Sequence, residues 1–409
     1  MRWRLRSIES VMAASSAAVE AIIVVTGYDH QASQSGGSSL NQVERVSERR
    51  DTSTLPAAYH SPQLDVAVRL NTNEAPSGPP PVWLDELIDG IRGLEWNRYP
   101  DRDATALRTA IAAHHGVDPA NVFAANGSNE VLQSILMAFG GQGRTAATFE
   151  PSYLLHRYIA EVTGTSVVSG ERNDHFDLSA DEVAGVLGSH RPDVTFLCSP
   201  NNPTGNVMSR DVLAAALDLV SDGPAAPGAT GLVVVDEAYA QFASWSSLDL
   251  VDEHRPLAVV RTFSKTWGLA GLRLGYAVAP RQVVAELERV VLPYHLDAAK
   301  QLAGTLALRH VDAMNDRVAQ IVAERERLTS ELRTLDIDVF DSEANFVLFR
   351  PRSRAGHDVW QALVDRGVLV RDCSSWPRLQ GCLRVTVGTA DEDDAFLAAM
   401  HEAMIAVPT

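Results

Sequence analysis

The stretch RTFSKTWGLAGLRLGY, Arg261–Tyr276, combines a lysine, hydroxyl residues and an arginine in an apolar setting. Lys265 follows Thr262 and Ser264, and Arg273 comes eight positions later. Apolar surroundings lower the pKa of an amine, which is what a lysine that forms a Schiff base requires. The hydroxyls and the guanidinium suit a phosphate dianion, which needs several fixed donors. The stretch thus predicts a nucleophilic lysine beside a phosphate site, with a snorkelling lysine on an ordinary helix as the alternative.

The composition is that of a globular protein with a large core. Of the 409 residues, 45% are hydrophobic and 21% are charged, which is enough for two domains. The net charge of -17 argues against nucleic acid or a membrane surface as a partner, although a local cluster of arginines can bind small anions. The three cysteines are too few and too scattered for a disulfide framework or a metal site, so we expect a cytoplasmic protein without a metal.

The N-terminal region has a basic start and an apolar run, Ala17–Gly27, similar to those of a signal peptide. Glu20 interrupts this run, which is also too short to span a bilayer. Serine, glycine, glutamine and charged residues then dominate up to Thr54. We therefore expect residues 1–54 to form a poorly ordered extension.

Strands alternate with helices through the middle of the chain, and several strands are unbroken apolar runs typical of strands covered on both faces. The predicted strands are Thr145–Phe149, Ser166–Ser169, Val194–Cys198, Leu232–Val235 and Leu257–Arg261. This alternation predicts an α/β fold with a mostly parallel sheet wrapped by helices. The functional loops of such a sheet follow the carboxyl ends of its strands.

The pattern changes after Pro293, where two long helices are predicted at Ala298–Met314 and Asp316–Leu335, followed by short strands and a closing helix. This is typical of a smaller α+β domain, and a cleft between domains suits a small molecule. The predicted divisions are an N-terminal arm with part of the small domain at 55–96, a large domain at 97–292 and the small domain at 293–409.

Three strand ends carry further polar side chains. The turn Gly127–Glu130 precedes a helix, whose free amides can cradle a phosphate. The loop SPNNPTG, Ser199–Gly205, can present the amide of Asn202 to a ring hydroxyl. Asp236 ends a buried strand, where a carboxylate needs a positive partner such as a protonated pyridine nitrogen. Each motif alone is also an ordinary cap, loop or packing turn, so the prediction depends on their combination.

Together these motifs resemble the fold-type I, pyridoxal-phosphate-dependent aminotransferases over nearly the whole chain from about residue 57 onward. The resemblance implies pyridoxal 5'-phosphate as the cofactor, with Lys265 as the lysine that binds it and moves a proton between substrate and cofactor. It also implies that Asp236 pairs with the ring nitrogen, while Asn202 and Tyr239 meet the phenolic oxygen. The other cofactor residues that it implies are Tyr153 on the ring face and, around the phosphate, Ser128, Asn129, Thr262, Ser264 and Arg273.

Within that superfamily the chain is most similar to the histidinol-phosphate aminotransferases. The matching strings are RLNTNE (69–74), NRYPDRDA (97–104), AANGSNE (124–130), LPYHL (292–296), SEANFVLFR (342–350), VRD (370–372) and LRVTVGT (383–389). The resemblance implies a homodimer in which Tyr99 reaches the cofactor phosphate of the other subunit. Its substrates are small molecules, an amino donor and a 2-oxo acid, and the residues that it implies for them are Tyr59, Tyr294, Arg371 and Arg384.

The substrates of that family set a physical problem, because histidinol phosphate carries a phosphate ester where glutamate carries a carboxylate. One site must accept either anion, and a guanidinium fork accepts both. The leading hypothesis is therefore transamination between L-histidinol phosphate and 2-oxoglutarate. The chain departs from the family pattern at Ala75–Gly78 and at Ser374–Trp376. The alternatives are an aromatic amino-acid aminotransferase, an enzyme similar to threonine-phosphate decarboxylase, and a protein that binds the cofactor without catalysis.

Overall fold

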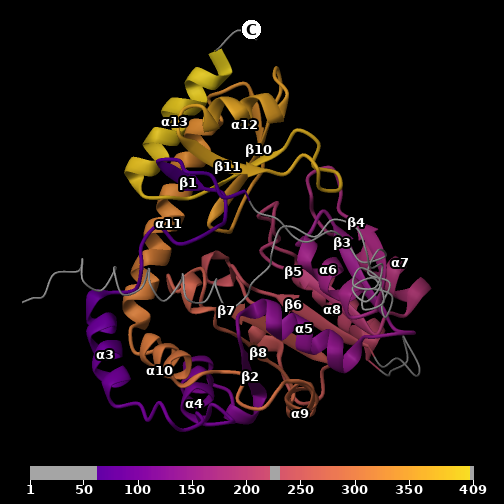
Figure 1. Cartoon of the computed structure of the whole chain (residues 1–409). Coiled ribbons are helices and arrows are strands. Elements are labelled where there is room, and N and C mark those ends of the chain that lie inside the picture. The colour runs from indigo at the N-terminus through magenta and orange to yellow at the C-terminus, as the bar shows by residue number, and fades with distance from the viewer. Residues whose placement is uncertain (1–61, 222–230, 406–409) are drawn as a thin grey trace, which may run out of the picture. The chain divides into compact units, whose positions relative to one another are not determined.

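The computed structural model describes residues 62–221 and 231–405 (Figure 1). The predicted extension 1–54 and Tyr59 lie outside the described residues. No helix within the described ranges is long and apolar enough to cross a membrane.

The larger sheet has seven strands in the order β2-β8-β7-β6-β5-β3-β4. The strands from β7 to β4 in this order pair in parallel with one another, while β8 runs antiparallel to both of its neighbours, β2 and β7. The bounds are β2 Val122–Ala125, β3 Thr145–Glu150, β4 Ser166–Glu171, β5 Val194–Cys198, β6 Leu232–Asp236, β7 Leu257–Thr262 and β8 Gly275–Val278. The prediction of a mostly parallel sheet is confirmed, and all five predicted strands are present. The antiparallel β8, which returns directly after the Lys265 stretch, was not predicted.

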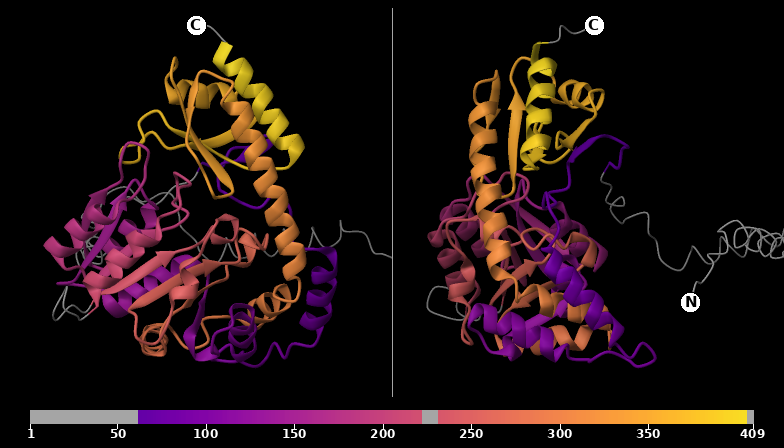
Figure 2. Two further views of the ribbon diagram at one scale, coloured as in Figure 1. Left: turned by 180° about the vertical axis from the view of Figure 1, so that it is seen from behind. Right: turned by 90° about the vertical axis from the view of Figure 1, so that its left-hand side faces the viewer.

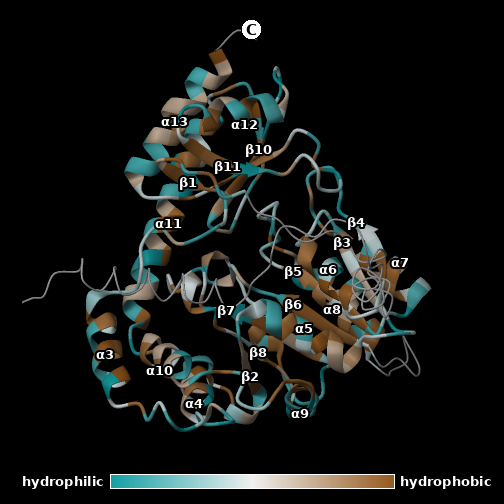
Figure 3. Cartoon of the chain, in the orientation of Figure 1, coloured by the Kyte–Doolittle hydropathy of each residue, from teal (hydrophilic) through white to brown (hydrophobic). Residues whose placement is uncertain are grey.

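Helices cover both faces of this sheet, which explains its unbroken apolar strands (Figure 3). Along β6, Val233 and Val235 pack into one core with helices α4, α7, α8 and α10, whereas Val234 packs into a second core with α5, α6 and α9. Alternate residues of a strand point to opposite faces, so a strand buried on both sides has no polar face. The helices are α4 Thr105–His115, α5 Ser128–Phe139, α6 Leu154–Val162, α7 Ala180–His190, α8 Arg210–Val220, α9 Arg281–Val290 and α10 Ala298–Ala307.

The smaller sheet has five strands in the order β1-β11-β12-β10-β9. Its first strand, β1, comes from the N-terminal segment, which comprises residues 62–92. This strand pairs in parallel with β11, while the other strand pairs of the sheet are antiparallel. Three helices accompany the sheet, and α11 and α13 run side by side (Figure 2). The bounds are β1 Val68–Leu70, β9 Ile337–Val339, β10 Phe346–Pro351, β11 Val368–Asp372, β12 Leu383–Thr386, α11 Val311–Leu332, α12 Gly356–Val364 and α13 Ala390–Ile405.

The N-terminal segment contacts both sheet regions. β1 belongs to the smaller sheet, whereas α3, Pro81–Arg92, packs against α10 beside the larger one. The indole of Trp83 in α3 donates to the Ala303 carbonyl of α10 at 3.1 Å. The segment between β1 and α3 therefore passes from one sheet to the other, and the predicted domain boundaries at 97 and 293 stay predictions.

The prediction of one helix over Ala298–Met314 was wrong. α10 ends at Ala307, and α11 begins at Val311. A tight turn separates them, in which the His310 N–H donates to the Ala307 carbonyl at 2.9 Å. The turn contains neither glycine nor proline, so helical periodicity continues on both sides without a sequence signal for the break.

Candidate active site

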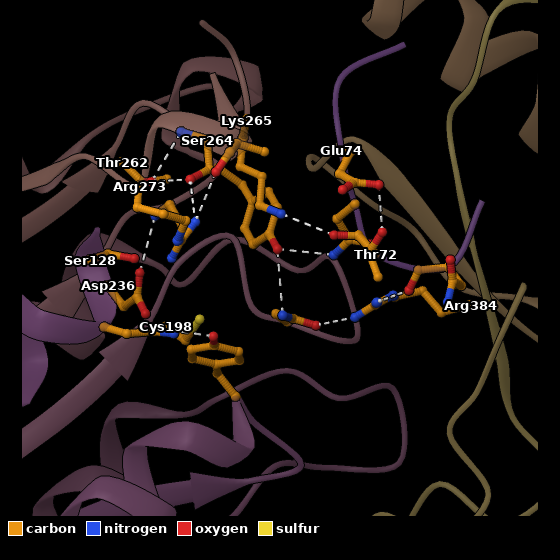
Figure 4. Close-up of a pocket in the computed structure, with 18 of the residues that line it drawn as sticks. Thr72, Glu74, Ser128, Cys198, Asp236, Thr262, Ser264, Lys265, Arg273 and Arg384 are labelled. Carbon is orange, nitrogen blue, oxygen red and sulfur yellow. Dashed lines mark hydrogen bonds between the residues drawn. The ribbon is translucent and has the colours of Figure 1, made fainter. Parts of the chain in front are cut away.

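The loops that follow β2, β5, β6 and β7 meet the N-terminal segment and β12 around a cavity of about 350 Å³ (Figure 4). Eleven of the predicted site residues line it, namely Ser128, Asn129, Tyr153, Asn202, Asp236, Tyr239, Thr262, Ser264, Lys265, Arg273 and Arg384. Tyr99, Tyr294 and Arg371 are not among its lining residues. Carboxyl ends of parallel strands meet at one edge of a sheet, which is why motifs far apart in sequence converge there.

Lys265 follows β7 and extends into the cavity, where its Nζ donates to the Thr72 carbonyl at 3.0 Å (Figure 4). The pKa of this amine is lowered to about 7, mainly by burial and also by the guanidinium groups of Arg384 and Arg273. The Glu74 carboxylate opposes the effect and raises the pKa. A large share of the amine is therefore unprotonated near neutral pH and able to attack a carbonyl carbon.

The lowered pKa predicts how the cofactor-free protein captures pyridoxal phosphate. Only the neutral amine attacks an aldehyde, so the rate of covalent capture should rise with pH. The midpoint of this rise should lie near pH 7, well below the pKa of 10.5 of an ordinary lysine. The growth of the cofactor's absorbance band after mixing measures this rate. Glu74→Gln should move the midpoint downward, since it removes the charge that raises the Lys265 pKa. A midpoint above pH 9 would contradict this prediction.

The N-terminus of α5 forms a cradle for an anion. Gly127 precedes the helix with φ of 86°, and a Cβ at Gly127 would come within 2.7 Å of an Arg273 nitrogen. A Cβ at Gly275, on β8, would lie 2.3 Å from the Ser128 amide nitrogen. Both glycines therefore keep space for the helix amides and the guanidinium to approach one point. Ser264 Oγ completes the group, since it accepts from Thr262 Oγ1 at 3.0 Å and from Arg273 Nη1 at 3.3 Å. Hydroxyls, helix amides and one arginine fit a phosphate dianion.

Asp236 ends β6 as a buried carboxylate and has a partner that the sequence reasoning missed. His156 Nε2 lies 3.0 Å from Asp236 Oδ2, and the Ala238 N–H donates to Asp236 Oδ1 at 3.2 Å. The His156 ring stacks on Phe196 with centroids 4.8 Å apart, and its Nδ1 has no hydrogen-bond partner among the described residues. The histidine thus fixes the position of the Asp236 carboxylate through its Oδ2 atom. Its only sequence signal is its place three residues after Tyr153 on the first turn of α6.

Tyr239 is buried, and its hydroxyl lies at the cavity between two amides. Tyr239 Oη accepts from Asn73 Nδ2 at 2.9 Å and faces Asn202 Nδ2 at 3.5 Å. Burial raises the pKa of this phenol, so the group is a neutral hydroxyl at physiological pH. Asn73 was also absent from the sequence prediction.

Two arginines lie side by side in the smaller sheet, since Arg371 of β11 and Arg384 of β12 are direct cross-strand partners. Both are buried. Arg384 lines the cavity, donates to Asn202 Oδ1 and donates through Nη2 to the Asn71 carbonyl at 3.0 Å. The Arg371 guanidinium carbon lies 5.5 Å from the centre of the Trp376 ring. Strand pairing therefore places a second cation next to the one that reaches the cavity.

Tyr99 and Tyr294 lie apart from this cavity. Their rings stack with centroids 4.6 Å apart, and both side chains are exposed. Tyr294 lines a second hollow of about 560 Å³, next to Leu292 and His295. Within the described residues, the structure brings neither tyrosine to the Lys265 cavity.

Lysine is rare in this chain, which has only Lys265 and Lys300 among its 35 basic residues. Lys300, in α10, donates to Asn126 Oδ1 and lies 3.5 Å from Asp297. The residues at Lys265 fit pyridoxal phosphate, because they offer a reactive amine, a buried carboxylate, an aromatic ring and an anion cradle in one cavity. The described residues hold no group of three histidine, cysteine or acidic side chains that could bind a metal ion.

The family model described as aminotransferase class I and II matches residues 65–400. A histidinol-phosphate aminotransferase from Frankia casuarinae is 48% identical over 363 residues, which cover 86% of this chain and 89% of that protein. Among solved structures, the histidinol-phosphate aminotransferase from Sinorhizobium meliloti in complex with pyridoxal 5'-phosphate has a TM-score of 0.75 at 22% identity, over 93% of this chain and 99% of that one. The L-threonine-O-3-phosphate decarboxylase from Porphyromonas gingivalis has a TM-score of 0.69 at 22% identity, over 82% and 98%.

The fold, the cavity and the family model define a pyridoxal-phosphate-dependent aminotransferase of class I and II. Within that class, the chain belongs to the histidinol-phosphate aminotransferase family. The predictions of the family, the fold class and the cofactor are thereby confirmed.

Proposed function

We propose that the enzyme transfers the amino group of L-histidinol phosphate to 2-oxoglutarate, giving imidazole acetol phosphate and L-glutamate, a step of histidine biosynthesis. The observation that carries the proposal is the cross-strand pair of Arg371 and Arg384 beside the Lys265 cavity. A phosphate monoester carries more negative charge than a carboxylate, so a site for both anions benefits from a second cation next to the first. The family membership supports the same substrate pair.

We assign the side chains of the cavity as follows. When bound, pyridoxal phosphate supplies an electron sink for the substrate carbon that loses its proton. Lys265 holds the cofactor and then moves that proton, for which its lowered pKa near neutrality is suited. Asp236, held by His156, keeps the ring nitrogen protonated through a buried charge pair. Tyr239 and Asn202 bind the phenolic oxygen.

The remaining cavity residues act in binding. Tyr153, whose ring packs edge-on against His156, stacks on the cofactor ring. The side chains around the N-terminus of α5 hold the phosphate, namely Ser128, Asn129, Thr262, Ser264 and Arg273. Arg384 binds the substrate anion, whereas the substrate roles that the family resemblance implies for Tyr59 and Tyr294 stay predictions, since Tyr294 lies outside this cavity. Asn202 and the Asn71 carbonyl hold Arg384 in place until the anion binds.

A panel of amino donors tests the proposal. Single-turnover reactions with histidinol phosphate, glutamate, phenylalanine and threonine phosphate are followed through the cofactor's absorbance. We expect histidinol phosphate and glutamate to react with the highest kcat/KM. Preference for phenylalanine would favour an aromatic amino-acid aminotransferase, and carbon dioxide release from threonine phosphate would favour a decarboxylase. Bound cofactor without reaction with any donor would indicate a binding protein.

Arg371→Ala should lower kcat/KM to different extents for the two anionic substrates. The loss should be larger for histidinol phosphate than for glutamate, because the phosphate has more charge to satisfy. We expect about a 100-fold loss of kcat/KM for histidinol phosphate, the effect of one nearby positive charge on the phosphate, and a clearly smaller loss for glutamate. Half-reaction kinetics with each donor measure the two values. Equal losses would contradict the role assigned to Arg371.

We further propose a cytoplasmic homodimer in which Tyr99 reaches the cofactor phosphate of the other subunit. The support is a set of exposed apolar side chains at Trp96, Tyr99, Leu292 and Tyr294, of which Tyr99 and Tyr294 stack on each other. Exposed apolar side chains that lie together are the kind of surface that a partner covers. Mixed dimers test whether Tyr99 acts in the site of the other subunit. If Tyr99→Ala and Lys265→Ala subunits are combined, one site of each hybrid has both native residues, and activity should return. No recovery in hybrids whose formation is verified by mass would contradict a crossing Tyr99.

A further inference from the structure

The string RLNTNE places Asn73 between the smaller sheet and the cavity. Asn73 is 1% exposed and has φ of 56°, a conformation that asparagine adopts more readily than most residues. Its backbone N–H donates to Thr386 Oγ1 at 2.9 Å, and its carbonyl accepts from Asn345 Nδ2 at 3.2 Å. The backbone of Asn73 is therefore held by β12 and by the residue before β10.

The contact with Thr386 determines which way the Asn73 amide points. Thr386 Oγ1 already accepts the Asn73 N–H, so its own proton donates to Asn73 Oδ1 at 3.1 Å. The Nδ2 group consequently faces Tyr239 and donates to Oη at 2.9 Å. Among the described residues, this is the nearest hydrogen bond to the Tyr239 hydroxyl.

A second amide approaches the same oxygen in a determined orientation. Arg384 donates to Asn202 Oδ1, and a guanidinium has no acceptor, so the Asn202 oxygen must face Arg384. The Nδ2 group of Asn202 therefore faces Tyr239 Oη, 3.5 Å away. Two N–H groups thus point at one phenolic oxygen, which has two lone pairs.

With both lone pairs facing donors, the Tyr239 proton has one direction left, into the cavity that Tyr239 lines. We propose that Asn73 is a positioning residue that makes Tyr239 a hydrogen-bond donor toward the phenolic oxygen of bound pyridoxal phosphate. The inference rests on the proposed role of Tyr239. It adds that the direction of this bond is set from the smaller sheet, through Thr386 and Asn73.

The test is the pH titration of the bound cofactor's absorbance in the holoenzyme. Tyr239→Phe should raise the midpoint by about one pH unit, the effect of one hydrogen bond to a charged oxygen, because an oxygen that loses its donor holds the neighbouring proton more tightly. Asn73→Gly keeps the positive φ and adds no charge, and it should raise the midpoint by about half as much. In a Tyr239→Phe background, Asn73→Gly should cause no further shift.

Asn345→Ala is the matched control, since it removes a bond to the Asn73 backbone without touching Tyr239. It should leave the midpoint unchanged, and thermal unfolding of each variant verifies that it is folded. If Tyr239→Phe causes no shift, the proposed role of Tyr239 is wrong. If Tyr239→Phe shifts the midpoint but Asn73→Gly does not, the inference about Asn73 is overturned. A midpoint shift in Asn345→Ala also overturns it. So does an Asn73→Gly shift that stays the same in the Tyr239→Phe background.

Discussion

Lys265→Ala should abolish transamination and the covalent attachment of the cofactor. The variant loses both the amine that binds pyridoxal phosphate and the group that moves the substrate proton, so we expect kcat to fall by about 10,000-fold or more. Borohydride treatment followed by mass spectrometry measures the attachment. The native protein should retain the mass of the reduced cofactor, and the variant should not.

Lys300→Ala provides the matched control, because Lys300 is the only other lysine in the chain. Lys300 contacts Asn126, in the turn after β2, and Asp297, directly before α10, and it does not line the Lys265 cavity. This variant should keep the borohydride-fixed mass. Fixed cofactor in Lys265→Ala, or its loss in Lys300→Ala, would contradict the assignment of the reactive lysine.

Arg384→Ala should have the second-largest effect. The guanidinium can form two charge-assisted hydrogen bonds with a carboxylate, and their loss should lower kcat/KM for glutamate by about 1,000-fold. Arg384→Lys should recover little, because an ammonium group lacks the planar fork. Since Arg384 also lowers the Lys265 pKa, the capture midpoint of the cofactor-free Arg384→Ala variant should rise. Half-reaction kinetics and the capture assay measure the two effects.

Arg350→Ala is the control of equal charge for Arg384. Arg350 lies on β10 beside β12, but its guanidinium faces Asp338 at 3.3 Å near the surface. Its removal should leave the glutamate reaction within about twofold, because exposed ion pairs contribute little. A comparable loss in both variants would show that net charge, and not the position of Arg384, explains the effect.

The cavity could be predicted in large part because its residues follow buried strands. Asn202, Asp236 and Lys265 each come just after or at the end of an apolar run, and parallel strands bring such positions together. Short-range patterns were sufficient for these residues, since each motif lies on a single strand–loop unit.

The missed residues depend on contacts that a local pattern does not contain. His156 reaches Asp236 only because β3, β5 and β6 are neighbours in the sheet, with α6 packed above them. Asn73 meets Thr386 across 313 positions of sequence. Arg371 was named as a substrate residue, yet its distance from the cavity depends on how β11 pairs with β12. Strand order and register are long-range properties, so these relations required the folded chain.

The scarcity of lysine has a consequence for how the enzyme is loaded with its cofactor. An aldehyde condenses with any unprotonated amine, and proteins rich in lysine consume it at many surface positions. Here one alternative side chain exists, and Lys300 is engaged by Asn126. A large excess of pyridoxal phosphate, or of an aldehyde probe, should therefore label the side chains of the cofactor-free protein with near single-site selectivity.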